Sequence, residues 1–177
     1  MNRVFEPVLF FPLPDGTWLA PVLSPWDVNA RSMGQDALPG ASIAVGEIAA
    51  ASASKPHLHP IVTQVTWLLE GALRVRMKGR QDAAPYELNL AAGQGVLTEP
   101  MTFFQLVNPG AARAARALYV VTPAYVYVPG EEGYDDAVVY EQSWEELTAA
   151  GFPTGSVDPV EMARTKRATA VARLSAR

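Results

Sequence analysis

Lys55-Pro-His-Leu-His-Pro-Ile-Val-Thr-Gln64 contains the only two histidines of this chain, His57 and His59. Alternate side chains of an extended segment face the same way, so both imidazoles point toward one place. Imidazole is the commonest metal ligand in proteins. The pair therefore predicts a metal site that still needs further ligands. A solvated pair at a surface turn is the alternative interpretation.

The sequence around the histidines is typical of short β-strands separated by turns. Residues 72–78 alternate Leu73, Val75 and Met77 with basic side chains, as in a half-exposed antiparallel strand. Similar runs recur every roughly 8 to 12 residues with glycine, proline or asparagine between them, which predicts an all-β sandwich or barrel. The expected strands are 42–50, 64–70, 72–78, 86–90, 95–98, 103–107 and 116–122.

The two ends of the chain differ from this central region. Residues 1–40 are apolar and punctuated by proline and glycine, which predicts an N-terminal arm or edge strands. Residues 41–125 are the expected barrel core, and residues 126–177 are an acidic flap with C-terminal helices, all within one domain. Ser143-Trp-Glu-Glu146 has the form of a capping box, which predicts a helix to about Ala150. Asp158-Pro-Val-Glu161 predicts the start of a second helix that runs toward Leu174.

Composition narrows the class of protein. The 177 residues are 49% hydrophobic and 18% charged, as in one compact soluble domain. A net charge of −4 argues against a nucleic-acid partner. No run of about 18 apolar residues is present to cross a membrane. The first residues make a poor signal peptide, so we expect a cytoplasmic protein. The absence of cysteine removes thiolate ligands and cysteine nucleophiles.

The spacing His57-x-His59-x4-Gln64-x6-Gly71 resembles the first motif of the cupin superfamily. Gly93, Pro100 and Gln105 stand in places similar to the second cupin motif. The resemblance implies a cupin-type antiparallel β-barrel or jelly roll, here with a C-terminal helical tail. Gln64 stands where the family has an acidic residue, Gln105 stands where it has a histidine, and the Gly93 to Pro100 spacer is one residue longer than usual.

The resemblance also implies a ligand set. By position, His57, His59, Gln64 and Gln105 would bind one divalent metal ion at the barrel mouth, with Fe(II) favoured and Zn(II), Mn(II) or Ni(II) as alternatives. A glutamine oxygen is neutral, so the ion keeps its full charge, binds less tightly and attracts an anionic substrate more strongly. Glu99, a tyrosine or water could replace a glutamine ligand. A decayed site without metal is the alternative.

Strand alternation from these positions predicts the substrate pocket. Thr66 and Leu68 should share the side of Gln64, and Phe103 and Val107 the side of Gln105. Arg74 or Arg76 is a candidate contact for an anionic substrate, although alternation along a solvated strand also explains both.

These expectations predict a mononuclear metal-dependent enzyme acting on a small oxygenated organic molecule. A non-heme dioxygenase is the favoured reaction class, and a metal-dependent isomerase, lyase or cyclase is the alternative. A non-catalytic cupin that binds a small ligand is the other candidate, and no catalytic residue is singled out. We expect a homodimer with neither nucleic-acid nor membrane partners, in which the Phe10-Phe11 arm and the C-terminal helix offer interface material.

Overall fold

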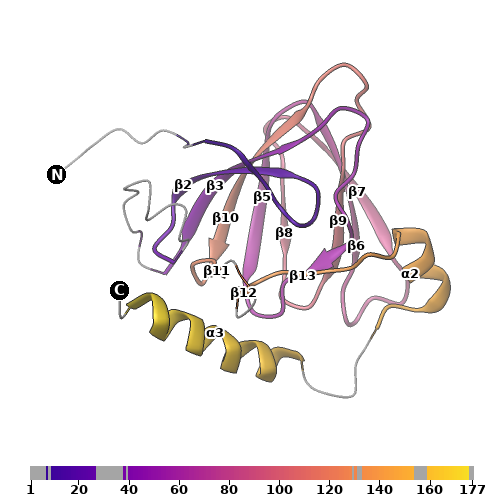
Figure 1. Ribbon diagram of the computed structural model, residues 1–177. Coiled ribbons are helices and arrows are strands. Elements are labelled where there is room, and N and C mark those ends of the chain that lie inside the picture. Colours follow the sequence, from indigo (N-terminus) through magenta and orange to yellow (C-terminus); the bar gives the residue numbers. More distant parts are fainter. Residues whose placement is uncertain are drawn as a thin grey trace.

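The body of the protein is a β-barrel made of two antiparallel sheets (Figure 1). The computed structural model describes residues 7, 9–26, 38, 40–128, 130, 133–153 and 159–175. The strands of the two sheets are β1 (Phe11–Pro12), β2 (Trp18–Leu23), β3 (Ser42–Ile48), β4 (His57–Leu58), β5 (Thr63–Glu70), β6 (Ala72–Lys78), β7 (Tyr86–Ala91), β8 (Gly95–Thr98), β9 (Phe103–Val107), β10 (Ala115–Thr122) and β13 (Val138–Val139). Their orders are β1-β2-β3-β10-β5-β8 and β13-β4-β9-β6-β7.

The alternation of side chains explains the barrel core. In β6, Leu73, Val75 and Met77 are buried while the basic residues between them are partly exposed. The all-β fold is confirmed, and the predicted strands 72–78, 95–98 and 103–107 match β6, β8 and β9 to the residue. Both sheets contribute to one cluster of buried side chains: Ile48, Leu68, Leu73, Val75, Met77, Leu90, Val96, Phe104, Leu106, Ala115, Ala117 and Tyr119.

Part of the expected N-terminal arm is built into the six-stranded sheet. β1 pairs with β2, and β2 pairs with β3 along most of its length. The turn between β1 and β2 holds Asp15 and Gly16, whose positive φ of 88° suits glycine. The Lys55 amide donates to the Asp15 carbonyl at 2.6 Å, which ties this turn to the residues just before β4.

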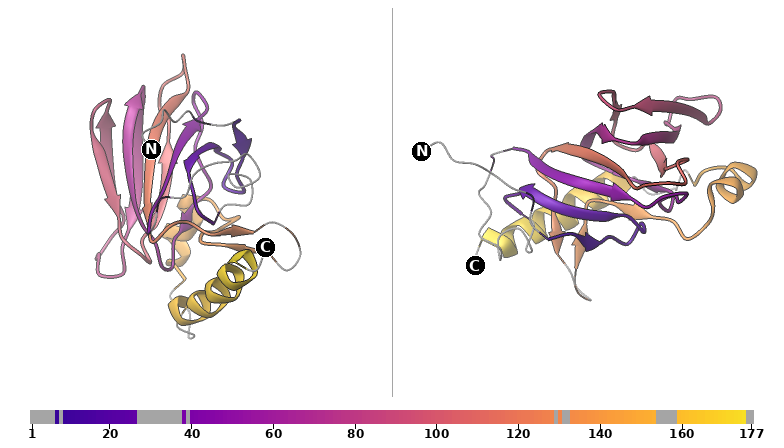
Figure 2. Two further views of the ribbon diagram at one scale, coloured as in Figure 1. Left: turned by 90° about the vertical axis from the view of Figure 1, so that its left-hand side faces the viewer. Right: turned by 90° about the horizontal axis from the view of Figure 1, so that it is seen from above.

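The two predicted helices are present (Figure 2). α2 (Trp144–Ala150) begins at the predicted capping box, in which Ser143 and Glu146 bond each other's backbone amides. Its Trp144 packs with Leu58 and Phe103 on the outside of the five-stranded sheet. α3 (Pro159–Ser175) runs past the predicted Leu174, and the expected N-cap Asp158 lies outside the described residues.

α3 lies below a small sheet formed by β11 (Tyr127–Val128) and β12 (Tyr134–Asp135) (Figure 1). Its Arg167 Nε is 3.1 Å from both carboxylate oxygens of Asp136, which is fully buried. Asp136 also accepts from the Val126 amide and from the Tyr134 hydroxyl, each at 2.7 Å. Among the described residues, no helix has the length and apolar character to span a membrane.

Candidate metal and ligand site in the barrel

A cavity opens into the barrel between the turn after β1 and the β11–β12 sheet. The volume of this cavity is about 90 Å³. One water needs roughly 10–15 Å³ by this measure, so the cavity has room for several waters or a small organic molecule. Most of the lining is apolar. The lining residues with polar groups that matter below are Asp15, His57, His59, Gln64, Tyr119, Tyr125, Tyr127 and Asp135.

His57 enters the cavity from β4, between β9 and β13. Its Nδ1 lies 2.9 Å from the carbonyl oxygen of Lys55, and Asp15 Oδ2 is 3.9 Å away on the same nitrogen. A carbonyl only accepts, so Nδ1 is the donor in this contact, and Nε2 is the nitrogen that the neutral ring would offer to a metal. A metal-binding histidine characteristically has this arrangement, with one nitrogen held by a backbone or carboxylate oxygen.

His59 is buried beside His57, with ring centroids 5.6 Å apart. Its Nδ1 is buried and has no hydrogen-bond partner. Burial, and after it the neighbouring His57, holds the pKa of His59 well below 6.5. The ring is therefore neutral at pH 7, the form that binds metals. Gln64 faces the same cavity from β5, and its Nε2 donates to the Thr66 hydroxyl at 3.0 Å.

The structure does not bring Gln105 to the histidines, so its expected place among the ligands was wrong. His57 pairs with Phe104 across β4 and β9, and the Phe104 ring lies 4.0 Å from the His57 centroid and 5.2 Å from that of His59. Gln105, the next residue, faces the opposite side of the sheet. There its Nε2 donates to the Ser54 carbonyl at 2.8 Å, and its Oε1 accepts from Arg76 at 3.2 Å.

The expected pocket lining was also wrong, because none of those five residues lines the cavity. Thr66 and Leu68 do share the side of Gln64, but they fill the barrel interior beyond it. The three others lie on the outer face of the five-stranded sheet, where they make other contacts: Phe103 with Phe152, Val107 in a bridge with Ala53, and Arg76 with Glu87 and Glu145.

Sequence reasoning missed the acidic and phenolic residues of the cavity. The Tyr125 hydroxyl donates to Asp135 Oδ1, which also accepts from the Ala137 amide at 2.9 Å. Burial raises the pKa of both Asp135 and Tyr125. Tyr119 was detectable, since alternation in residues 115–122 turns it inward. Asp15 and Asp135 had no local signal, because one lies in a turn sequence and the other in an acidic run.

Solved structures share this architecture at low sequence identity. CapF of Staphylococcus aureus, a capsular polysaccharide assembling protein, matches with a TM-score of 0.56 and 13% identity over 77% of this chain and 32% of CapF. KdgF from Halomonas sp. matches with a TM-score of 0.50 and 14% identity over 66% of this chain and 88% of KdgF. A domain of Drosophila melanogaster CENP-C matches with a TM-score of 0.50 and 7% identity over 64% and 72% of the two chains.

CapF and KdgF are cupin-fold proteins. The chain has the cupin fold. The matched part of the chain corresponds to about a third of the length of CapF, and at such identities the likeness concerns the fold alone. No protein-family model and no curated protein matches the sequence.

The cavity offers a divalent ion two imidazole nitrogens and an incomplete set of further ligands. His57 Nδ1 is engaged by the Lys55 carbonyl, which leaves Nε2 as the nitrogen for a metal, and the buried Nδ1 of His59 has no hydrogen-bond partner. Across the described ranges, no three His, Asp or Glu side chains are arranged as metal ligands. Gln64 lines the same cavity, so its amide oxygen is a candidate third donor, and the Phe104 ring packs against both histidine rings.

Proposed function

We propose that this cupin is a mononuclear metal-dependent enzyme that acts on a small oxygenated organic molecule. His57, His59 and Gln64 would hold one divalent ion. The observation that carries this proposal is the histidine pair, with one Nδ1 fixed by a backbone carbonyl and the other buried without a partner. The lowered pKa of His59 adds support, because a neutral imidazole need not lose a proton to bind a metal.

The charge around such an ion comes from the cavity rather than from its ligands. Two imidazoles and an amide are neutral, so the ion would supply strong Lewis acidity to an oxygen of the substrate. Asp15 stands near His57, and Asp135 lines the same cavity. The two carboxylates can therefore offset the charge of the ion without binding it.

Two reaction classes follow from the cupin resemblance and the cavity. The resemblance favours a non-heme dioxygenase with Fe(II). The pairing of Asp135 with Tyr125 favours proton transfer instead, as in an isomerase, lyase or cyclase, because burial raises the pKa of the carboxyl toward the range useful in acid–base catalysis. If the protein is an isomerase, lyase or cyclase, Asp135→Asn should abolish turnover while the metal stays bound. If it is a dioxygenase, both the wild type and Asp135→Asn should consume dioxygen when substrate is added.

A non-catalytic cupin that binds a small ligand is the rival. The place of Phe104 against both histidine rings favours it, since an apolar ring stands on the side where another ligand is needed.

Metal titration separates these possibilities. Purified protein is stripped with a chelator and titrated with Fe(II) under nitrogen, and with Zn(II), Mn(II) and Ni(II). We expect one ion per chain in the wild type, and loss of binding in the double variant His57→Gln/His59→Gln. The matched control Gln105→Ala should bind metal as the wild type does, because its side chain faces away from the cavity. Absence of binding in the wild type, or binding that survives the double variant, would reject the metal site.

The homodimer, the cytoplasmic location and the absence of nucleic-acid and membrane partners expected from the sequence stay predictions.

A further inference from the structure

We infer that the cavity selects a ligand with a small organic cation, such as a quaternary ammonium group, held between two carboxylates and a wall of aromatic rings. The inference concerns the ligand of the site proposed above and rests on that proposed function for its location beside the histidines. It runs against the anionic substrate that the neutral ligand set alone suggests.

The charged groups that line the cavity are the first evidence for a cationic ligand. Asp15 and Asp135 both line the cavity, and no lysine or arginine does so among the described residues. Each carboxylate is fixed through one oxygen: Thr17 donates to Asp15 Oδ1 through its amide and its hydroxyl, at 3.0 and 2.8 Å, and Tyr125 and Ala137 donate to Asp135 Oδ1. The other oxygen of Asp15, Oδ2, lies 3.9 Å from His57 Nδ1. In the metal-free cavity, an anion would meet two carboxylates and no lysine or arginine, which is costly in a buried site.

Aromatic rings form a second, independent feature of the same cavity. Phe11, Tyr119, Tyr125 and Tyr127 line it. The faces of such rings attract organic cations, and walls of several rings are a recurrent way to bind quaternary ammonium groups. The neighbouring lining is aliphatic and suits methyl groups.

An unused hydroxyl marks where a ligand would be bound. Tyr119 is 6% exposed, and its hydroxyl is buried without a hydrogen-bond partner. A buried hydroxyl without a partner is costly, so a ligand oxygen is expected to pair with it. The ring lies against β3 because Gly46 has no side chain there: a Cβ on Gly46 would be 2.5 Å from the Tyr119 oxygen.

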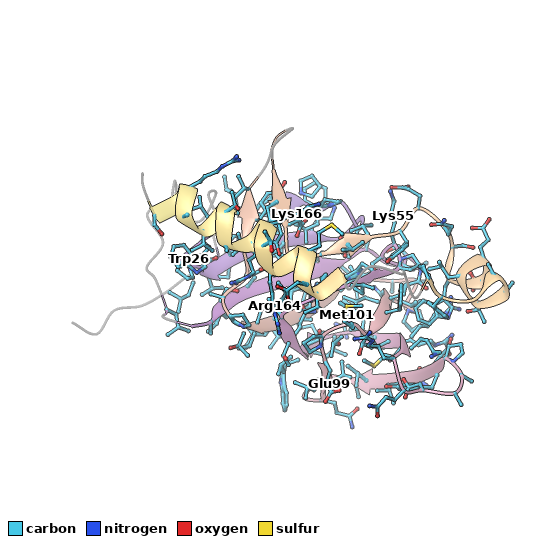
Figure 3. All side chains as sticks on the ribbon, turned by 90° about the horizontal axis from the view of Figure 1, so that it is seen from below. Trp26, Lys55, Glu99, Met101, Arg164 and Lys166 are labelled. Carbon is cyan, nitrogen blue, oxygen red and sulfur yellow. The ribbon has the colours of Figure 1, made fainter. Side chains whose placement is uncertain are left out.

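The test compares three ligands of one shape and different charge. Choline, its neutral analogue 3,3-dimethyl-1-butanol and the anion 3,3-dimethylbutanoate are titrated by calorimetry into chelator-stripped and Zn(II)-loaded protein. We expect choline to bind at least about tenfold more tightly than the neutral analogue, and the anion to bind least. Asp15→Asn/Asp135→Asn should remove that preference. Glu99→Gln, which deletes an exposed negative charge away from the cavity, should keep it (Figure 3).

Three results would overturn the inference: equal affinity for choline and the neutral analogue, preference for the anion, or no binding of any of the three. The wild type alone decides between these outcomes if the double variant does not fold. The preference is measured with and without metal. A wild type that prefers choline but binds no metal therefore keeps the inference and rejects the metal proposal, and the reverse result does the opposite.

Discussion

Gly46→Ala tests the packing of Tyr119 in the cavity wall. A Cβ at this position would lie 2.1 Å from Tyr119 Cε2 and 2.5 Å from Cζ. The ring would have to move by roughly 1 Å or more to reach ordinary van der Waals contact. It is buried in the barrel core, where overpacking typically costs about 1–3 kcal/mol. We expect the free energy of unfolding, measured by urea denaturation, to fall by that amount.

A double-mutant cycle tests the reason for this loss. Tyr119→Ala alone should cost about 3–5 kcal/mol, as for other large aromatic side chains in cores. In that background the clash is gone, and Gly46→Ala should be neutral or stabilising by up to about 1 kcal/mol, since alanine suits a strand better than glycine. The same cost of Gly46→Ala in both backgrounds would refute the contact with Tyr119 as the cause.

Four further predictions concern the histidines and α3. Gln64→Glu should tighten divalent-metal binding in calorimetric titrations, because a carboxylate compensates the charge of the ion; equal or weaker binding contradicts this. Phe104→His should likewise tighten it by adding an imidazole that faces both histidines, and an unchanged affinity would show that the side chain points elsewhere. In metal-free protein, the lowered pKa of His59 means that the unfolded chain binds the proton more readily, so the unfolding free energy should fall as pH drops below 6.5; His59→Gln should lose this dependence. Arg167→Leu leaves Asp136 buried without its ion pair and should cost about 3–5 kcal/mol in thermal or urea unfolding, whereas a cost below about 1 kcal/mol would mean that the pair does not hold α3.

The fold was predictable because local patterns and tertiary packing agree in it. The alternation of Leu73, Val75 and Met77 and the box at Ser143 depend on neighbours in sequence, and both reappear in the structure. The histidines were predictable for the same reason. Gln105 was misplaced because strand alternation has a period of two, so an error of one residue moves a side chain to the other face of the sheet. Its neighbour Phe104 has the inward position.

The acidic part of the site was not predictable from local patterns. Asp15 and Asp135 are 120 residues apart and meet only when the β1–β2 turn docks at Lys55 and β12 pairs with β11. Neither event has a signature in the sequence, since a turn and an acidic surface run look the same whether or not they close a cavity.

The two-residue strand β12 connects the interior of the barrel to the outside of the molecule. Asp135 lines the cavity, and Asp136, the next residue, is gripped by Arg167 of α3. The two aspartates are joined by a single peptide bond, so a shift of one displaces the backbone of the other. We therefore expect a ligand that binds Asp135 to change how firmly Asp136 and Arg167 hold α3, and the rate at which a protease cleaves α3 would report on it.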